Sequence, residues 1–166
     1  MRYQSRLIVA LLGLTACADP QKTGGDAMYS HSVQLVHFRH DQVEERGEVS
    51  AEGAVSAFRE FPFEEQIRQA ETLPSPTFPT VSFRSQSDGS VLAVWSLEPG
   101  LYEVYLEADG KKVTAETTDA QYVEQAIRSF FSGGRAVLLE RLSETPNAVT
   151  ASRGVWGWLK SMFGRR

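Results

Sequence analysis

The stretch from residue 80 to residue 117 constrains the fold most, because strand-like runs alternate there with short turns. Apolar and polar residues alternate from Thr80, and residues 91–97 form a dense apolar run. The dipeptide Asp109-Gly110 is the strongest hairpin signal in the chain, since both turn positions favour positive φ. These runs follow one another through short turns, so they predict consecutive hairpins and an antiparallel sheet of four to five strands.

Side-chain alternation gives each predicted strand a buried face. Tyr102, Val104 and Leu106 fall on one face of their strand, and Glu103 and Tyr105 fall on the other. The polar run from Lys111 to Thr117 suits a sheet edge, where lysines oppose pairing with other chains. The side chains that we expect to be largely buried are Val94, Trp95, Leu106, Ile127 and Phe130.

Helical patterns flank the strand run on both sides. A β-rich run at 32–40 indicates a first strand, and the charged residues 41–49 indicate a loop. Ser50 is placed as a helix N-cap, and Pro62 predicts two short helices or one helix with a kink.

A second helical pattern follows the strands. Asp119, or Thr118 before it, is placed as the N-cap, and Gly133-Gly134 is placed at the C-terminal end of that helix. Residues 137–142 fit a strand or a helix, and we favour a helix.

This order predicts an α+β fold with two layers, an antiparallel meander sheet and helices packed on one side of it. We expect four segments: a signal peptide at 1–16, a flexible tether at 17–30, an α+β domain at 31–142, and at 143–166 a linker with a short amphipathic helix.

The first residues have the pattern of a secretory signal peptide. Arg2 and Arg6 precede an apolar run at 7–12, and small residues then precede Cys17, which is the only cysteine of the chain. The apolar run is shorter than the ~20 residues that span a bilayer, which weakens the alternative of a permanent membrane helix. An ordinary cleaved signal peptide and a cytosolic core segment remain as further alternatives.

Leu14-Thr15-Ala16-Cys17 resembles a bacterial lipobox, the sequence recognised by lipoprotein signal peptidase. The resemblance implies that Cys17 is acylated and becomes the first residue of the mature protein. It also implies localisation in the bacterial cell envelope, and Ala18 directly after the cysteine favours the outer over the inner membrane. Two or more acyl chains would make such an anchor stable. Membrane lipid, attached through Cys17, is therefore one expected partner.

Composition and motifs point away from several other functions. The chain has a net charge of −4 at pH 7, although residues 153–166 contain four basic residues and no acid, so the preceding part is more acidic still. An acidic body argues against nucleic acid as a partner. We find no catalytic motif and expect neither an enzyme nor a cofactor. If His37 and His40 lie on a strand, they face opposite sides, which argues against a metal site.

The C-terminal segment at residues 154–163 combines aromatic residues with one lysine, Lys160. As a helix it would be amphipathic, and we expect it to contact a membrane surface. The residues expected to make this contact are Trp156, Trp158, Leu159, Lys160 and Phe163. The alternatives are that this segment packs on the sheet or is disordered.

These features favour a lipid-anchored cell-envelope protein whose domain binds an unidentified envelope protein or an incoming protein. The stretch from Thr80 to Gly134 resembles, loosely and without a specific motif, small bacterial immunity proteins that pair a meander with an aromatic-rich helix. The most specific function that this likeness implies is an immunity role, in which the domain binds an incoming toxin. The alternatives are a structural envelope lipoprotein acting in assembly or cell-wall contact, and a hydrolase with an unrecognised site.

Overall fold

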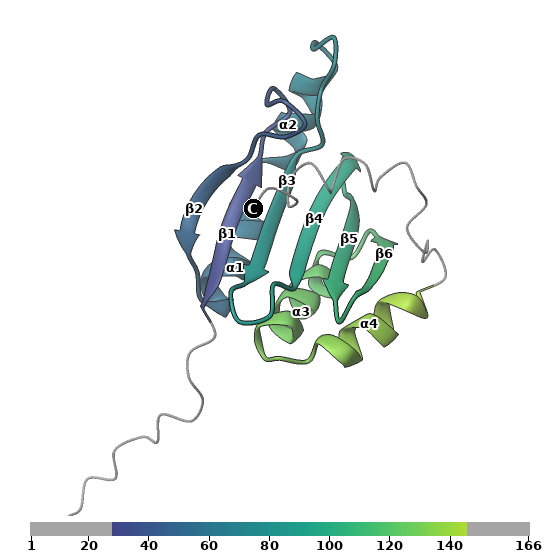
Figure 1. Ribbon diagram of the computed structural model, residues 1–166. Coiled ribbons are helices and arrows are strands. Elements are labelled where there is room, and N and C mark those ends of the chain that lie inside the picture. The colour runs from purple at the N-terminus through teal and green to yellow at the C-terminus, as the bar shows by residue number, and fades with distance from the viewer. Residues whose placement is uncertain (1–27, 146–166) are drawn as a thin grey trace, which may run out of the picture.

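The computed structural model describes residues 28–145, which form a six-stranded antiparallel sheet and four helices (Figure 1). The order of the strands across the sheet is β2-β1-β3-β4-β5-β6. In chain order the elements are β1 (Tyr29–Gln34), β2 (Glu44–Glu48), α1 (Ala51–Glu60), α2 (Phe63–Ala70), β3 (Thr80–Ser85), β4 (Val91–Glu98), β5 (Leu101–Ala108), β6 (Lys111–Thr117), α3 (Ala120–Phe131) and α4 (Arg135–Ser143). The predicted α+β class is confirmed, with six strands in place of four to five.

Strands β3 to β6 form the predicted meander. Val81 pairs with Val94, and Val94 pairs in turn with Val104, so one valine row crosses three strands. Asp109 and Gly110 turn the chain from β5 into β6 with φ angles of 53° and 70°. Asp109 is the only residue other than glycine with positive φ among residues 28–145, as expected for a tight hairpin.

The first two strands differ from the prediction. Strand β1 ends at Gln34, whose side-chain amide donates hydrogen bonds to the carbonyls of Arg39 and Gln42, both at 3.1 Å. These bonds hold a loop where the sequence pattern predicted continued strand, so the strand prediction for 32–40 was wrong beyond Gln34. The charged stretch predicted as loop contains β2, which pairs with β1 and is exposed along its whole length.

Helices α1 and α2 are separate, which decides between the two alternatives at Pro62. The Ser50 hydroxyl accepts a hydrogen bond from the Gly53 backbone N–H at 3.2 Å and caps α1, as predicted. Phe61, directly before the proline, is extended with φ −69° and ψ 126°, as residues preceding proline prefer. The chain therefore leaves α1 at Phe61 and starts α2 at Phe63.

Helices α3 and α4 follow the predicted boundaries closely. The Asp119 carboxylate accepts a hydrogen bond from the Gln121 backbone N–H at 2.8 Å, so Asp119 is the N-cap of α3. Gly133 has φ 81°, a left-handed conformation that suits glycine after a helix C-terminus. The segment that fitted either a strand or a helix is helical, because Leu138 and Leu142 both reach the core from α4.

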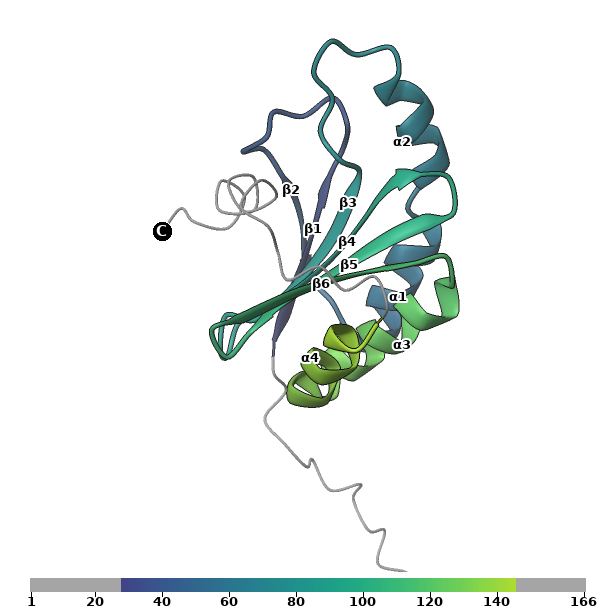
Figure 2. The same cartoon turned by 90° about the vertical axis from the view of Figure 1, so that its right-hand side faces the viewer.

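All four helices lie on one side of the sheet (Figure 2). The core between the two layers joins apolar side chains of β3 to β6 with those of the helices. The five side chains predicted to be buried are at most 1 % exposed: Val94, Trp95, Leu106, Ile127 and Phe130. Trp95 stands apart from the others, because it does not belong to the core that the helices cover.

Candidate functional site

A hollow of about 540 Å³ opens to solvent where α1 meets α2, and we call it the α1–α2 hollow. It is the leading candidate for a binding surface because it combines aromatic rings with charged groups. Residues of both helices, of β5 and of the start of α3 line it: Phe58, Arg59, Glu60, Phe61, Pro62, Phe63, Glu64, Glu65, Arg68, Tyr102, Ala120 and Glu124.

Four aromatic rings form the floor of the hollow. Phe61 and Phe63 meet edge to face with their centroids 4.6 Å apart, and Tyr102 lies 5.6 Å from Phe63 and 5.3 Å from Phe58. Edge-to-face arrangements of this kind are favoured between aromatic rings. Phe58 and Phe63 are buried, whereas Phe61 and Tyr102 remain partly exposed. The hollow therefore offers an apolar floor on which two rings are accessible.

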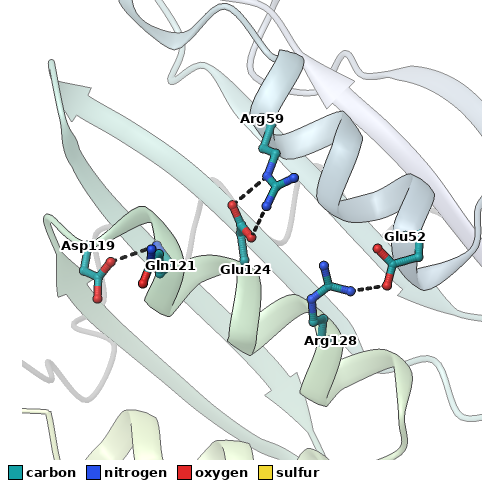
Figure 3. Close-up of polar contacts among 6 residues, drawn as sticks. All are labelled: Glu52, Arg59, Asp119, Gln121, Glu124 and Arg128. Carbon is teal, nitrogen blue, oxygen red and sulfur yellow. Dashed lines mark hydrogen bonds and ion pairs between the residues drawn. The ribbon is translucent and has the colours of Figure 1, made fainter.

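Two ion-pair bridges tie α1 to α3 beside this floor (Figure 3). The Arg59 guanidinium donates two hydrogen bonds to the Glu124 carboxylate, at 2.7 and 2.6 Å. Arg128, which lies one turn after Glu124 on α3, pairs with Glu52 of α1. The hydrogen bonds from Arg59 hold the pKa of Glu124 below its usual value. Arg59, Arg128 and Glu52 are largely exposed and Glu124 is partly buried, so the bridges orient the two helices more than they stabilise them.

The remaining charges of the rim are mostly acidic. Arg68 pairs with Glu65 at 2.5 Å within α2, and this hydrogen bond lowers the pKa of the Glu65 carboxyl. Glu60 and Glu64 line the hollow as well, and neither has an ion-pair partner within residues 28–145. The hollow thus presents two unpaired carboxylates beside an aromatic floor.

The sequence builds this hollow through the break between α1 and α2. Pro62 stops α1 and places Phe61 and Phe63 on either side of the break. Gln66 then fixes α2 to the loop that follows β1, because its side-chain carbonyl accepts a hydrogen bond from the Val36 backbone N–H at 3.0 Å. The dense aromatic sequence around Pro62 was the available signal. The contact of these aromatic residues with Tyr102 of β5 could not be predicted from the spacing of residues along the sequence.

The histidines do not come together as a site. His31 lies on β1 with its ring centroid 5.4 Å from that of Phe83, and burial and then the charge of Arg46 lower its pKa. His37 and His40 lie in the exposed loop after β1, so the argument that placed them on opposite faces of a strand does not apply. Within the part of the chain that the structure describes, no three His, Cys, Asp or Glu side chains are arranged to hold a metal ion.

The predicted lipidation site and the predicted membrane contacts lie outside the described residues. Cys17 precedes residue 28, and the five residues of the C-terminal segment follow residue 145: Trp156, Trp158, Leu159, Lys160 and Phe163. Among helices within residues 28–145, none has the length and apolar character needed to cross a membrane.

Two carboxylates of β5, Glu103 and Glu107, have different surroundings. Glu107 accepts a hydrogen bond from the Tyr105 hydroxyl at 2.8 Å and pairs with Lys112 at 2.9 Å. Glu103 lies beside Glu116 of β6. Burial raises the pKa of Glu103, the charge of Glu116 raises it further, and a hydrogen bond from Trp95 opposes both effects.

We expect Glu103→Gln to raise the thermal midpoint at pH 7. The folded protein holds a proton on Glu103 more tightly than the unfolded chain does. Stability is therefore lost as pH rises from the unfolded pKa through the higher folded pKa. The gain should shrink towards about pH 4, where the carboxyl is increasingly protonated in both states. Thermal unfolding at both pH values measures it, with Glu45→Gln on exposed β2 as the control. An equal gain at both pH values would refute this origin.

In comparisons with known proteins, no protein-family model matches the chain, and neither a curated protein nor a solved structure matches it.

Proposed function

We propose that this protein is a lipid-anchored cell-envelope protein whose α+β domain binds another protein through the α1–α2 hollow. The single observation that supports the binding role is the aromatic floor, on which Phe61 and Tyr102 are accessible between charged groups. Aromatic residues, phenylalanine and tyrosine among them, are enriched in the cores of protein interfaces. The lipobox resemblance at Leu14–Cys17 supports the anchor.

The partner that fits this hollow presents a basic segment with an apolar side chain at its tip. Glu60 and Glu64 are the unpaired charges of the rim, so a lysine or arginine of the partner would complement them. The apolar tip would pack on Phe61 and Tyr102. An immunity protein that captures an incoming toxin is one form of this proposal.

The chemistry of the hollow supports binding over catalysis. Its lining contains four glutamates but no histidine, cysteine or serine. Two of these glutamates are held by arginines in hydrogen bonds that keep their pKa values low. General acid–base catalysis near neutral pH favours a carboxyl group with a raised pKa. We therefore favour protein binding over a hydrolase activity as the function of this hollow.

If Cys17 carries the lipid anchor, its substitution should prevent acylation of the protein. Cells fed a palmitate analogue are expected to label the parent protein, and Cys17→Ser is expected to abolish the label because the acylated thiol is lost. Ala18→Ser is the matched control, since it leaves the cysteine in place and should be labelled like the parent. A label that persists in Cys17→Ser would refute lipid attachment at this residue.

The binding role makes a second prediction at Phe61. Phe61→Asp places a charge on the accessible part of the floor, so recovery of the bound partner from the envelope is expected to fall at least about tenfold, the range of a hot-spot residue. Phe78→Asp is the matched control, because Phe78 is 38 % exposed and lies outside the hollow. Equal recovery with both variants would show that the hollow is not the binding surface.

A further inference from the structure

The second face of the sheet, opposite the helices, carries its own buried side chains. Strand pairing aligns them in rows, and the central row contains Ser32, Ser82, Ala93, Tyr105 and Thr114. Trp95 lies in the next row, beside Thr80 and Glu103. Small side chains thus lie next to two large aromatic rings, Trp95 and Tyr105, whose centroids lie 6.2 Å apart.

This face is buried although no described helix or strand covers it. Trp95 is 1 % exposed, and Tyr105 and Ala93 are fully buried. All four helices pack on the opposite side of the sheet, and among residues 28–145 no other element lies over this face (Figure 2). Neighbours in the same sheet shield a side chain from the sides only, because side chains stand roughly perpendicular to the sheet. Burial this complete requires a covering layer, and that layer must come from beyond the described helices and strands.

We propose that the C-terminal segment, residues 154–163, packs as an amphipathic helix on this second face and forms a third layer of the fold. Its apolar residues would rest on Ala93, Trp95 and Tyr105. This proposal does not depend on the lipid anchor or on the α1–α2 hollow.

The length of the chain after α4 allows this placement. α4 packs against β6 and β5, and Thr145 just after it is held by the Tyr122 hydroxyl at 3.1 Å. Strands lie about 4.8 Å apart, so β4 is roughly 10 Å in from the β6 edge. Residues 146–153 extend at most about 26 Å at roughly 3.3 Å per residue. That reach is sufficient to pass around the edge and arrive over β4.

Charge complementarity favours the same segment. Glu103, Glu107 and Glu116 lie on the second face, and only Glu107 has a described ion pair, with Lys112. Residues 153–166 carry four basic residues and no acid. At the other end of the chain, residues 17–27 contain no run of large apolar residues that could cover a tryptophan.

Two single substitutions in the C-terminal segment test the proposal. The protein would start at residue 17 with Cys17→Ser, so that the apolar leader is absent, and would carry Trp156→Phe and Trp158→Phe, so that Trp95 is its only tryptophan. Leu159→Asp charges the apolar side of the proposed helix, and Ser161→Asp adds the same charge on its opposite side. Acrylamide quenching of Trp95 fluorescence and the thermal midpoint are then measured.

Leu159→Asp is expected to increase the quenching constant of Trp95 several-fold and to lower the thermal midpoint by at least about 5 °C. Ser161→Asp should leave both values near those of the parent. Leu159→Ala provides a milder change in the same direction if Leu159→Asp does not fold.

Three outcomes would overturn the proposal. Unchanged quenching and an unchanged midpoint in Leu159→Asp would show that other residues cover Trp95. Loss of binding to anionic vesicles, with both of those values unchanged, would assign the segment to a membrane surface. A parent protein that sediments as a dimer, and that Leu159→Asp converts to monomer, would place the segment on a second copy.

Discussion

Phe130→Ala is expected to lower the free energy of unfolding by about 3–5 kcal/mol. The Phe130 side chain is fully buried near the C-terminus of α3. Its ring meets Tyr29 edge to face at 5.6 Å, and the Arg135 guanidinium lies 5.2 Å from its centroid. The truncation removes contacts that join β1, α3 and α4, so the surrounding side chains cannot fill the cavity without moving all three elements.

Denaturant unfolding followed by circular dichroism measures this loss. Gln121→Ala is the matched control, because its side chain is exposed on the same helix and should change the free energy of unfolding by less than about 0.5 kcal/mol. If both variants unfold at the parent's denaturant midpoint, the buried face of α3 has been assigned to the wrong residues.

Trp95→Ala is expected to cost a similar amount, about 3–5 kcal/mol, although Trp95 lies on the other face of the sheet. The side chain is 1 % exposed, and its ring lies 6.2 Å from that of Tyr105. A loss of this size requires Trp95 to be enclosed by packed atoms, because an indole resting on an open sheet would lose little contact on truncation.

Leu97→Ala is the matched control for Trp95. It truncates another large apolar side chain on the same strand, but Leu97 is 43 % exposed, so we expect less than about 1 kcal/mol. Thermal and denaturant unfolding of both variants would give the comparison. A loss for Trp95→Ala no greater than that for Leu97→Ala would mean that the second face of the sheet is open to solvent.

The strand meander and the helix boundaries could be predicted from the sequence because local residues determine them. Asp109-Gly110 specifies its own turn, and Ser50 and Asp119 cap helices through hydrogen bonds to residues two or three positions away. Alternation along β5 likewise placed Leu106 towards the helices. In each case the interaction that fixes the structure lies within a few residues of the signal.

Strand β2 could not be predicted for the opposite reason. Its residues, Glu44 to Glu48, are all exposed, so no apolar alternation marks the strand. Backbone pairing with β1 holds it in place at the edge of the sheet. The end of β1 depends similarly on the Gln34 side chain and its hydrogen bonds to the following loop.

The candidate site was predictable only in part. Pro62 and the neighbouring aromatic residues marked a break between helices. The hollow arises when that break packs against Tyr102 of β5 and Glu124 of α3, which are distant in sequence. The burial of Trp95 was predicted from the dense apolar run 91–97, but such a run does not indicate what covers each side of its strand.

Site-specific photo-crosslinking in intact cells tests the proposed binding role of the α1–α2 hollow most directly. A photoreactive phenylalanine analogue would replace Phe61 in one strain and Val137 in another, since Val137 is 66 % exposed on α4 and lies outside the hollow. If the hollow binds a partner protein, position 61 gives a discrete protein adduct that is absent from position 137. No adduct at position 61, or the same adducts at both positions, would contradict this binding role.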